Sequence, residues 1–272
     1  IFVAFKLLIN EDQIKQQLQE LVRQQTNGSL SINGPLSLAI IPRLSLSLGQ
    51  LSYQLDTEST PLGQIQELRL GVGLWPLLSG RIEVDEIGLA GLKLQLRRDQ
   101  QGVGNWEQVK KIEAATPAPQ QQSPGPATAS AEPATEAEAF SLSIAKLSIS
   151  DAVINFEDQL TGASYKLDNF SMDGSNVDLE GDAFPLAMSF SLALSDPALQ
   201  TTVQLSSQAS LNPEQQRYRF EQLEMTVSAL GEMTRQEKLL ANISTTVDLD
   251  LEKEQATLSN LKLNLEDIEP ED

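Results

Sequence analysis

The sequence contains neither histidine nor cysteine, and aromatic residues make up only 5% of its 272 residues. Without cysteine the chain cannot form a disulfide, a cysteine-ligated zinc site or a thiol nucleophile, and without histidine it cannot form a Ser-His-Asp triad. An enzyme made from these residues would have to use a carboxylate pair, a Ser-Lys pair or a carboxylate-bound metal. The two absences therefore leave few catalytic mechanisms open.

Basic residues are also scarce, because 19 Lys and Arg face 38 Asp and Glu, which gives a formal net charge of −19. A nucleic-acid-binding surface needs a basic patch, and electrostatic docking on anionic lipid needs clustered Lys and Arg. The charge balance argues against both kinds of partner. The length allows one or two domains, at about 150 residues per domain.

Apolar residues nevertheless make up 40% of the chain, and most of them are Leu, Ile, Val or Ala. Residues 1–9 are apolar apart from Lys6, which is too short a run for the roughly 20 residues that span a bilayer. Because the next residues are abruptly polar, we interpret 1–9 as the end of an N-terminal transmembrane anchor. The alternative is a buried first strand or helical turn.

Residues 10–25 have the pattern of an amphipathic helix. Asn10 is suited to the N-cap, and Gln13 three positions later suits a capping box. One apolar stripe follows at helical spacing, formed by Ile14, Leu18, Leu21 and Val22. Asn27-Gly28 then predicts the end of the helix.

From Ser29 onward the apolar residues recur at every second position, and Gly, Pro, Asn and Asp separate the alternating runs. Clear examples are 36–40, 44–48, 92–96 and 186–194. This pattern is typical of antiparallel strands with one apolar and one polar face. The predicted fold is therefore mainly β, with one amphipathic N-terminal helix.

Residues 114–139 interrupt the strands with a run rich in Pro, Ala and Ser that has no apolar periodicity. Such a segment cannot bury enough apolar surface to fold, and we interpret it as a disordered insert. It separates a first block, 10–113, from a second block of strands, 140–268, which we expect to continue the same sheet. The acidic residues 269–272 are interpreted as the end of a fragment.

An apolar sheet face must be covered by something. Helices are too few to cover a dozen strands, so the face either packs on another part of the sheet or lines a groove. A sandwich or barrel core usually contains large aromatic side chains, whereas these positions are mostly Leu, Ile and Val. The composition mildly favours a groove for acyl chains and leaves an ordinary sandwich or barrel core open.

No catalytic or metal-binding motif stands out. Ser143 and Lys146 have the Ser-x-x-Lys spacing, but that chemistry needs both residues on one helix face, and they lie in an alternating strand. The Gly71-Val72-Gly73 run lacks the rest of a dinucleotide-binding loop, and no calcium-loop spacing occurs. We therefore expect no enzyme activity, no metal and no cofactor.

Two stretches resemble the AsmA family of Gram-negative bacteria. The first, 9–106, contains a Pro-Leu-Leu-x-Gly turn at 76–80, a Leu-x-Gly-Leu strand at 89–92 and an Asn105-Trp106 end. The second, 142–190, resembles the strand, acidic and Thr-Gly pattern that follows the linker in that family, with Thr161-Gly162 as the turn.

The resemblance implies more than the residues do by themselves. It implies an inner-membrane anchor, a body in the periplasm, and a fold like that of the chorein-type bridge proteins, in which a long, curved, folded-over antiparallel sheet forms an apolar groove for phospholipid. The implied function is lipid transfer and outer-membrane homeostasis, with phospholipid, the inner membrane and other envelope proteins as partners. The alternative is a non-enzymatic scaffold for outer-membrane protein biogenesis with a closed, lipid-free β core.

We predict that alternating residues on one face of the strands line this groove. The predicted lining residues are Leu36, Leu38, Ile40, Leu44, Leu46, Leu48, Leu92, Leu94, Leu96, Leu142, Ile144, Leu186, Met188, Phe190 and Leu192.

Overall fold

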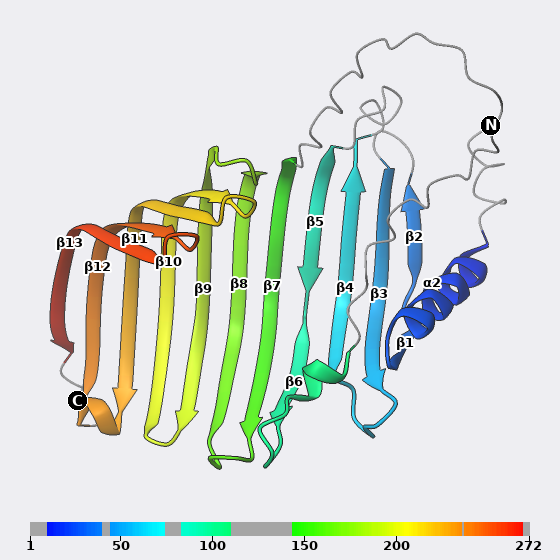
Figure 1. Ribbon diagram of the computed structural model, residues 1–272, viewed down its shortest axis with the longest axis horizontal. Coiled ribbons are helices and arrows are strands. Elements are labelled where there is room, and N and C mark those ends of the chain that lie inside the picture. Colours follow the sequence, from blue (N-terminus) through cyan, green and yellow to red (C-terminus); the bar gives the residue numbers. More distant parts are fainter. Residues whose placement is uncertain (1–9, 40–43, 74–82, 110–142, 236, 269–272) are drawn as a thin grey trace, which may run out of the picture.

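A computed structural model describes residues 10–39, 44–73, 83–109, 143–235 and 237–268. These described residues form one sheet of 13 strands with one α-helix at one end (Figure 1). The prediction of a mainly β chain with one N-terminal helix is confirmed. The predicted anchor at 1–9 and the insert at 114–139 lie outside the described residues.

The helix α2 (Glu11–Gln25) begins where its sequence predicts. The side chain of Asn10 accepts hydrogen bonds from the backbone N–H groups of Asp12 and Gln13, so the N-cap satisfies two of the helix's free donors. The apolar stripe packs on the sheet through Ile14 and Leu18. Lys15 fixes the helix further by donating from Nζ to the carbonyl oxygen of Gly34 at 2.8 Å.

The first half of the sheet contains six strands. They are β1 (Gly28–Ile32), β2 (Leu36–Ala39), β3 (Leu44–Leu55), β4 (Gly63–Val72), β5 (Val84–Ala90) and β6 (Lys93–Arg98). β1 and β2 both pair with β3. On the other side of β4, β5 and β6 both pair with β4, one after the other along its length. A short 3-10 helix, η1 (Asn105–Gln108), ends this half.

The second half is a run of neighbouring hairpins. Its strands are β7 (Ser143–Asp158), β8 (Ser164–Asp178), β9 (Ala183–Ser195), β10 (Ala198–Asn212), β11 (Arg217–Gly231), β12 (Lys238–Asp250) and β13 (Gln255–Ile268), with the 3-10 helix η2 (Glu232–Thr234) before β12. Each strand from β8 to β13 pairs antiparallel with the strand before it. The upper ends of the last strands bend over the sheet (Figure 1).

The two halves join in one sheet, but they join by parallel pairing. β7 runs parallel to both β5 and β6, with Ile87 beside Leu147 and Leu96 beside Phe156. The prediction of an entirely antiparallel sheet is therefore wrong at this position. Parallel neighbours need a connection of a dozen or more residues, and residues 99–142 are long enough to return the chain to the other end of the sheet.

The β10–β11 and β12–β13 hairpins repeat the same turn and bulge after 38 residues. In each turn a side chain at the end of the first strand accepts a backbone N–H three residues on, from Gln215 to Asn212 and from Lys253 to Asp250. In each hairpin a buried hydroxyl donates across the pair to a carbonyl 14 residues later. These donors are Ser207, to Glu221, and Thr245, to Ser259, both at 2.9 Å.

A β-bulge follows each of these hydroxyls. The next residue after each acceptor carbonyl, Gln222 or Asn260, has a positive φ, and the strand register shifts there. A bulge leaves one backbone group of the ladder unpaired and increases the local twist. The buried hydroxyl meets the carbonyl at this position, so the hairpin keeps its hydrogen bonds where the ladder is interrupted.

Candidate functional site

The strand register places several of the predicted residues beside apolar partners on one face of the sheet, which we call the apolar face. Residues directly opposite one another on paired strands project to the same side. On this basis Leu38 lies beside Leu46, Leu94 beside Ile154, Leu96 beside Phe156, and Leu192 beside Leu167. Of the predicted lining residues, Ile40 and Leu142 lie outside the described residues.

One line of side chains crosses the entire sheet without a polar member, and we call it the central row. Each member is the cross-strand partner of the next: Leu36, Leu48, Leu68, Leu89, Ile149, Met172, Met188, Leu205, Met225, Ile243 and Leu263. With strands about 4.8 Å apart, its eleven strand positions extend over about 48 Å. That exceeds the roughly 30 Å hydrocarbon thickness of a bilayer.

The neighbouring line on the other face has the opposite chemistry, and we call it the polar row. Its members are Ser47, Arg69, Gly88, Ser148, Asp173, Ala187, Ser206, Glu224, Ser244 and Lys262. Parts of it border a shallow hollow of about 670 Å³. The described residues contain no cluster of three or more acidic side chains that could hold a metal.

The apolar face is closed at one end by the helix. Leu36 and Leu48, the first two members of the central row, are buried together with Ile32 and Leu51. Ile14 and Leu18 of α2 pack on this cluster. These two predicted lining residues therefore belong to a packed core under the helix, which an acyl chain could reach only by displacing α2.

Beyond the helix, the side chains of the central row are only partly covered. Its members from Leu68 to Ile243 are half-buried, which means that neighbouring side chains cover only part of their surface. The predicted residues Leu92, Leu94, Met188, Phe190 and Leu192 have the same partial exposure. This open stretch is the part of the face with apolar surface left to cover.

A second packed cluster lies toward the upper ends of the strands. Ile144, Val177, Phe184 and Ala209 are buried there, and Leu147 and Leu186 pack against them. Ile144 and Leu147 are three residues apart yet share this cluster, and Asn176 on the paired strand has a positive φ at the same level. Ile144 is therefore also a core residue rather than part of the open stretch.

Aromatic side chains mark the opposite, lower margin of the apolar face. The rings of Trp106 and Phe156 have centroids 5.8 Å apart, and Phe156 stacks on Tyr165 at the same distance. Gly104 allows this arrangement, because a Cβ there would come within 2.3 Å of the Trp106 ring. The Asn105 side chain completes this corner, where β4 no longer pairs with β6. Its Oδ1 accepts from the Arg97 N–H, and its Nδ2 donates to the Gln95 carbonyl oxygen.

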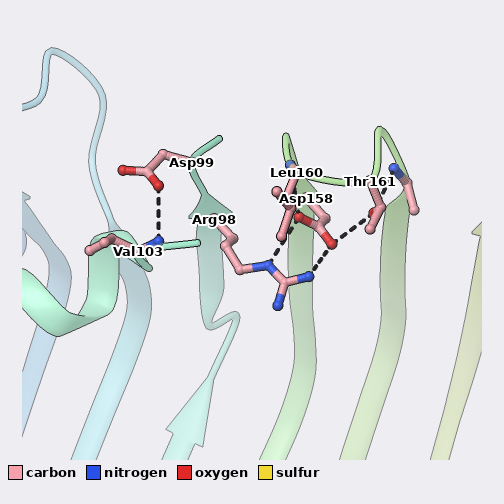
Figure 2. A network of polar contacts seen from close by, with 7 residues as sticks. Arg98, Asp99, Val103, Asp158, Leu160 and Thr161 are labelled. Carbon is pink, nitrogen blue, oxygen red and sulfur yellow. Dashed lines mark hydrogen bonds and ion pairs between the residues drawn. The ribbon is translucent and has the colours of Figure 1, made fainter. Parts of the chain in front are cut away.

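The β7–β8 turn beside this corner is held by one carboxylate (Figure 2). Asp158 is buried and accepts from Arg98 Nε at 3.0 Å, from Arg98 Nη2, from the Leu160 N–H at 3.0 Å and from the Thr161 hydroxyl at 2.7 Å. The bond from the Arg98 guanidinium, helped by Thr161 and Leu160, holds the pKa of Asp158 well below its usual range. The bonds from Arg98 join β6 to the turn and those from Leu160 and Thr161 hold the turn itself, so Arg98 and Asp158 form a structural ion pair.

Comparison with known proteins identifies the family of the chain. A model described as the AsmA family matches residues 1–268. The chain belongs to the AsmA family. It is 32% identical over 93 residues to Protein AsmA of Escherichia coli (strain K12), a match that covers 34% of this chain and 15% of that protein. No solved structure matches.

Membership of the AsmA family associates the chain with the bacterial envelope. None of the helices among the described residues is both long and apolar enough to cross a membrane.

Sequence reasoning did not identify most of the central row, including Leu68, Leu89 and Met172. Each of them lies in a strand where apolar and polar residues alternate in the sequence. Only the register between strands shows that they align in one row.

Proposed function

We propose that the open stretch of the apolar face binds the acyl chains of phospholipids in the periplasm. The observation that carries this proposal is the central row, which crosses eleven strand positions without a polar side chain and stays half-exposed from Leu68 to Ile243. Monomeric soluble proteins rarely leave so long an apolar surface uncovered unless it meets a ligand, a membrane or another protein.

The two faces have complementary tasks in this proposal. An acyl chain on the central row would gain about 0.8 kcal/mol for each methylene that leaves water. An acyl chain gains about as much when it is inside a bilayer, so lipid could move between the bilayer and the protein without a tightly binding site. The polar row and the net charge of −19 would keep the outer face in water.

The wider role is part of the same proposal. The chain would be attached to the inner membrane through residues preceding the helix, and would take part in phospholipid transfer and outer-membrane homeostasis. The family assignment and the match to Protein AsmA support an envelope role. No catalytic step is part of the proposal.

The scaffold alternative rests on a closed, lipid-free β core. The described strands instead form an open sheet, in which β1 and β2 at one edge do not pair with β13 at the other. The open sheet disfavours that alternative.

Site-specific photo-crosslinking tests the proposal. A photoreactive amino acid replaces Leu94 on the apolar face, and in a matched variant it replaces the adjacent Gln95, which projects to the other face. Each variant is expressed in a Gram-negative bacterium, irradiated in cells and analysed by mass spectrometry for attached phospholipid. We expect adducts at position 94 and none at 95. Equal labelling of both positions, or phospholipid at neither, would refute the assignment.

A further inference from the structure

Three of the protein's four methionines lie together in the central row. Met172 of β8 is paired with Met188 of β9, and Leu205 of β10 separates this pair from Met225 of β11. We call these four side chains the methionine segment. All of them are half-buried, so they belong to the open stretch of the apolar face. The remaining methionine, Met233, lies in η2, outside the row.

The methionine segment differs from its surroundings in stiffness. Met is unbranched, has three rotatable side-chain bonds and adapts to irregular contacts, a property that promiscuous binding surfaces use. The row continues with Ile149 on one side and Ile243 on the other, and a β-branched side chain has few allowed rotamers. Along the same strands, the neighbouring lines of the apolar face contain the buried residues Val203, Ser207 and Leu223. The segment is therefore the deformable part of an otherwise rigid surface.

The methionine segment is about as long as one acyl chain. It crosses the four neighbouring strands β8 to β11, and three spacings of about 4.8 Å give about 14 Å. One acyl chain fills half of the roughly 30 Å hydrocarbon core of a bilayer, which is about 15 Å. An acyl chain that lies along the row can therefore place its middle, where a cis double bond bends it, on the methionines.

We propose that Met172, Met188 and Met225 let the central row bind phospholipids with bent acyl chains as readily as those with straight chains. A surface that stays in contact with a bent chain must change its shape beneath the bend. Met side chains do so by rotating, whereas a Leu must leave its preferred rotamer. The inference rests on the proposed binding of acyl chains, and it adds cis-unsaturated phospholipid as a ligand class.

Two lipids that differ only in the bend of their chains provide the test. Dioleoyl-phosphatidylethanolamine has a cis double bond in each chain, and dielaidoyl-phosphatidylethanolamine has the same bond in the straight trans form. The dielaidoyl lipid carries deuterium, so that mass spectrometry distinguishes the two. The delipidated 272-residue protein is incubated with an equimolar mixture of both lipids in detergent and re-isolated, and its bound lipid is quantified.

Three variants separate the role of the methionines from that of any apolar side chain. The main variant is Met172→Leu/Met188→Leu/Met225→Leu. Exchanges of Met for Leu conserve volume and usually cost little stability, and circular dichroism verifies the fold. Met233→Leu is the matched control, because it removes a methionine outside the row. Leu205→Met is the converse variant, because it makes the whole segment methionine.

We expect the wild type and Met233→Leu to bind the two lipids in about equal amounts. The triple variant should bind the dielaidoyl lipid as the wild type does and about fivefold less dioleoyl lipid, since its Leu side chains must leave their preferred rotamers. Leu205→Met should raise the dioleoyl share.

The inference is overturned if the triple variant keeps the wild-type ratio of the two lipids, or if Met233→Leu shifts the ratio as much. It is also overturned if Leu205→Met fails to raise the dioleoyl share. In all three cases the wild type still binds lipid, and the proposed function stands. A wild type that binds neither lipid would instead refute acyl-chain binding itself, and this inference with it.

Discussion

A single charge in the central row should remove lipid from the protein. Met188 lies in β9 between Met172 and Leu205, its partners on either side. All three side chains are half-buried, so an acyl chain above them would complete their burial. We choose Met188→Glu as the perturbation because a carboxylate cannot be covered by an acyl chain without losing its hydration, at a cost of several kcal/mol.

The expected size follows from the surface involved. Full burial of such side chains is worth about 1.5–3 kcal/mol each, and these are half-buried already, so an acyl chain gains about 1 kcal/mol from each. An acyl chain that no longer contacts these three side chains loses about 3 kcal/mol of binding free energy, which corresponds to roughly a 100-fold fall in lipid occupancy. The measurement is quantitative mass spectrometry of phospholipid that copurifies with the protein.

The adjacent Ala187 provides the matched control for Met188. It belongs to the polar row, is exposed, and lies beside Asp173 and Ser206 on the opposite face. Ala187→Glu adds the same charge at almost the same place in the sequence and should leave lipid occupancy unchanged. If both variants retain lipid equally while circular dichroism shows both folded, the apolar face is not the lipid site.

Three further changes test the architecture. Leu36→Ala should lower the free energy of unfolding by about 3 kcal/mol in urea titrations, because Leu36 is buried under the helix; a loss below 1 kcal/mol would mean that α2 is not packed there. Thr245→Val should cost about 1–2 kcal/mol, since the Ser259 carbonyl loses its hydroxyl partner, and the exposed Thr257→Val should cost almost nothing. Asp158→Asn should lower the melting temperature at pH 7. Because Arg98 depresses the folded-state pKa of Asp158, this stabilisation is complete above the unfolded pKa of about 4 and is lost as pH falls toward the folded value. The wild type and the variant should therefore converge in acid, and a constant difference would contradict the ion-pair assignment.

Local signals in the sequence predict the individual elements well. The helix α2 needs only its Asn10 cap and its apolar stripe, both of which lie within a few residues of one another. The strand β9 alternates without interruption from Leu186 to Leu194, and its register with β10 has no shift. In both cases the information that fixes the element is contained in the element.

The arrangement of the elements depends on contacts that the sequence does not display. Nothing near Leu96 or Phe156 indicates that their strands lie parallel, because residues 99–142 separate the two strands in the sequence. Leu36 and Ile144 show the same alternation as Met188, yet the structure places them in packed clusters. Bulges hide the central row for a similar reason, since a residue such as Asn260 breaks the alternation that would otherwise align one strand with the next.

The parallel junction between β7 and the β5–β6 pair also has a consequence for how the protein folds. Each strand from β8 to β13 pairs with the one just before it, so each contact closes only a short loop. The junction must close a loop that includes all of residues 99–142, and the entropy cost of closure grows as about (3/2)RT ln n with loop length n. The hairpins of β7–β13 should therefore form early, and docking of β7 on β5 and β6 should be a later, slower event. Until that docking occurs, the apolar face exists as two shorter surfaces, and the continuous central row is the last feature of the native sheet to be assembled.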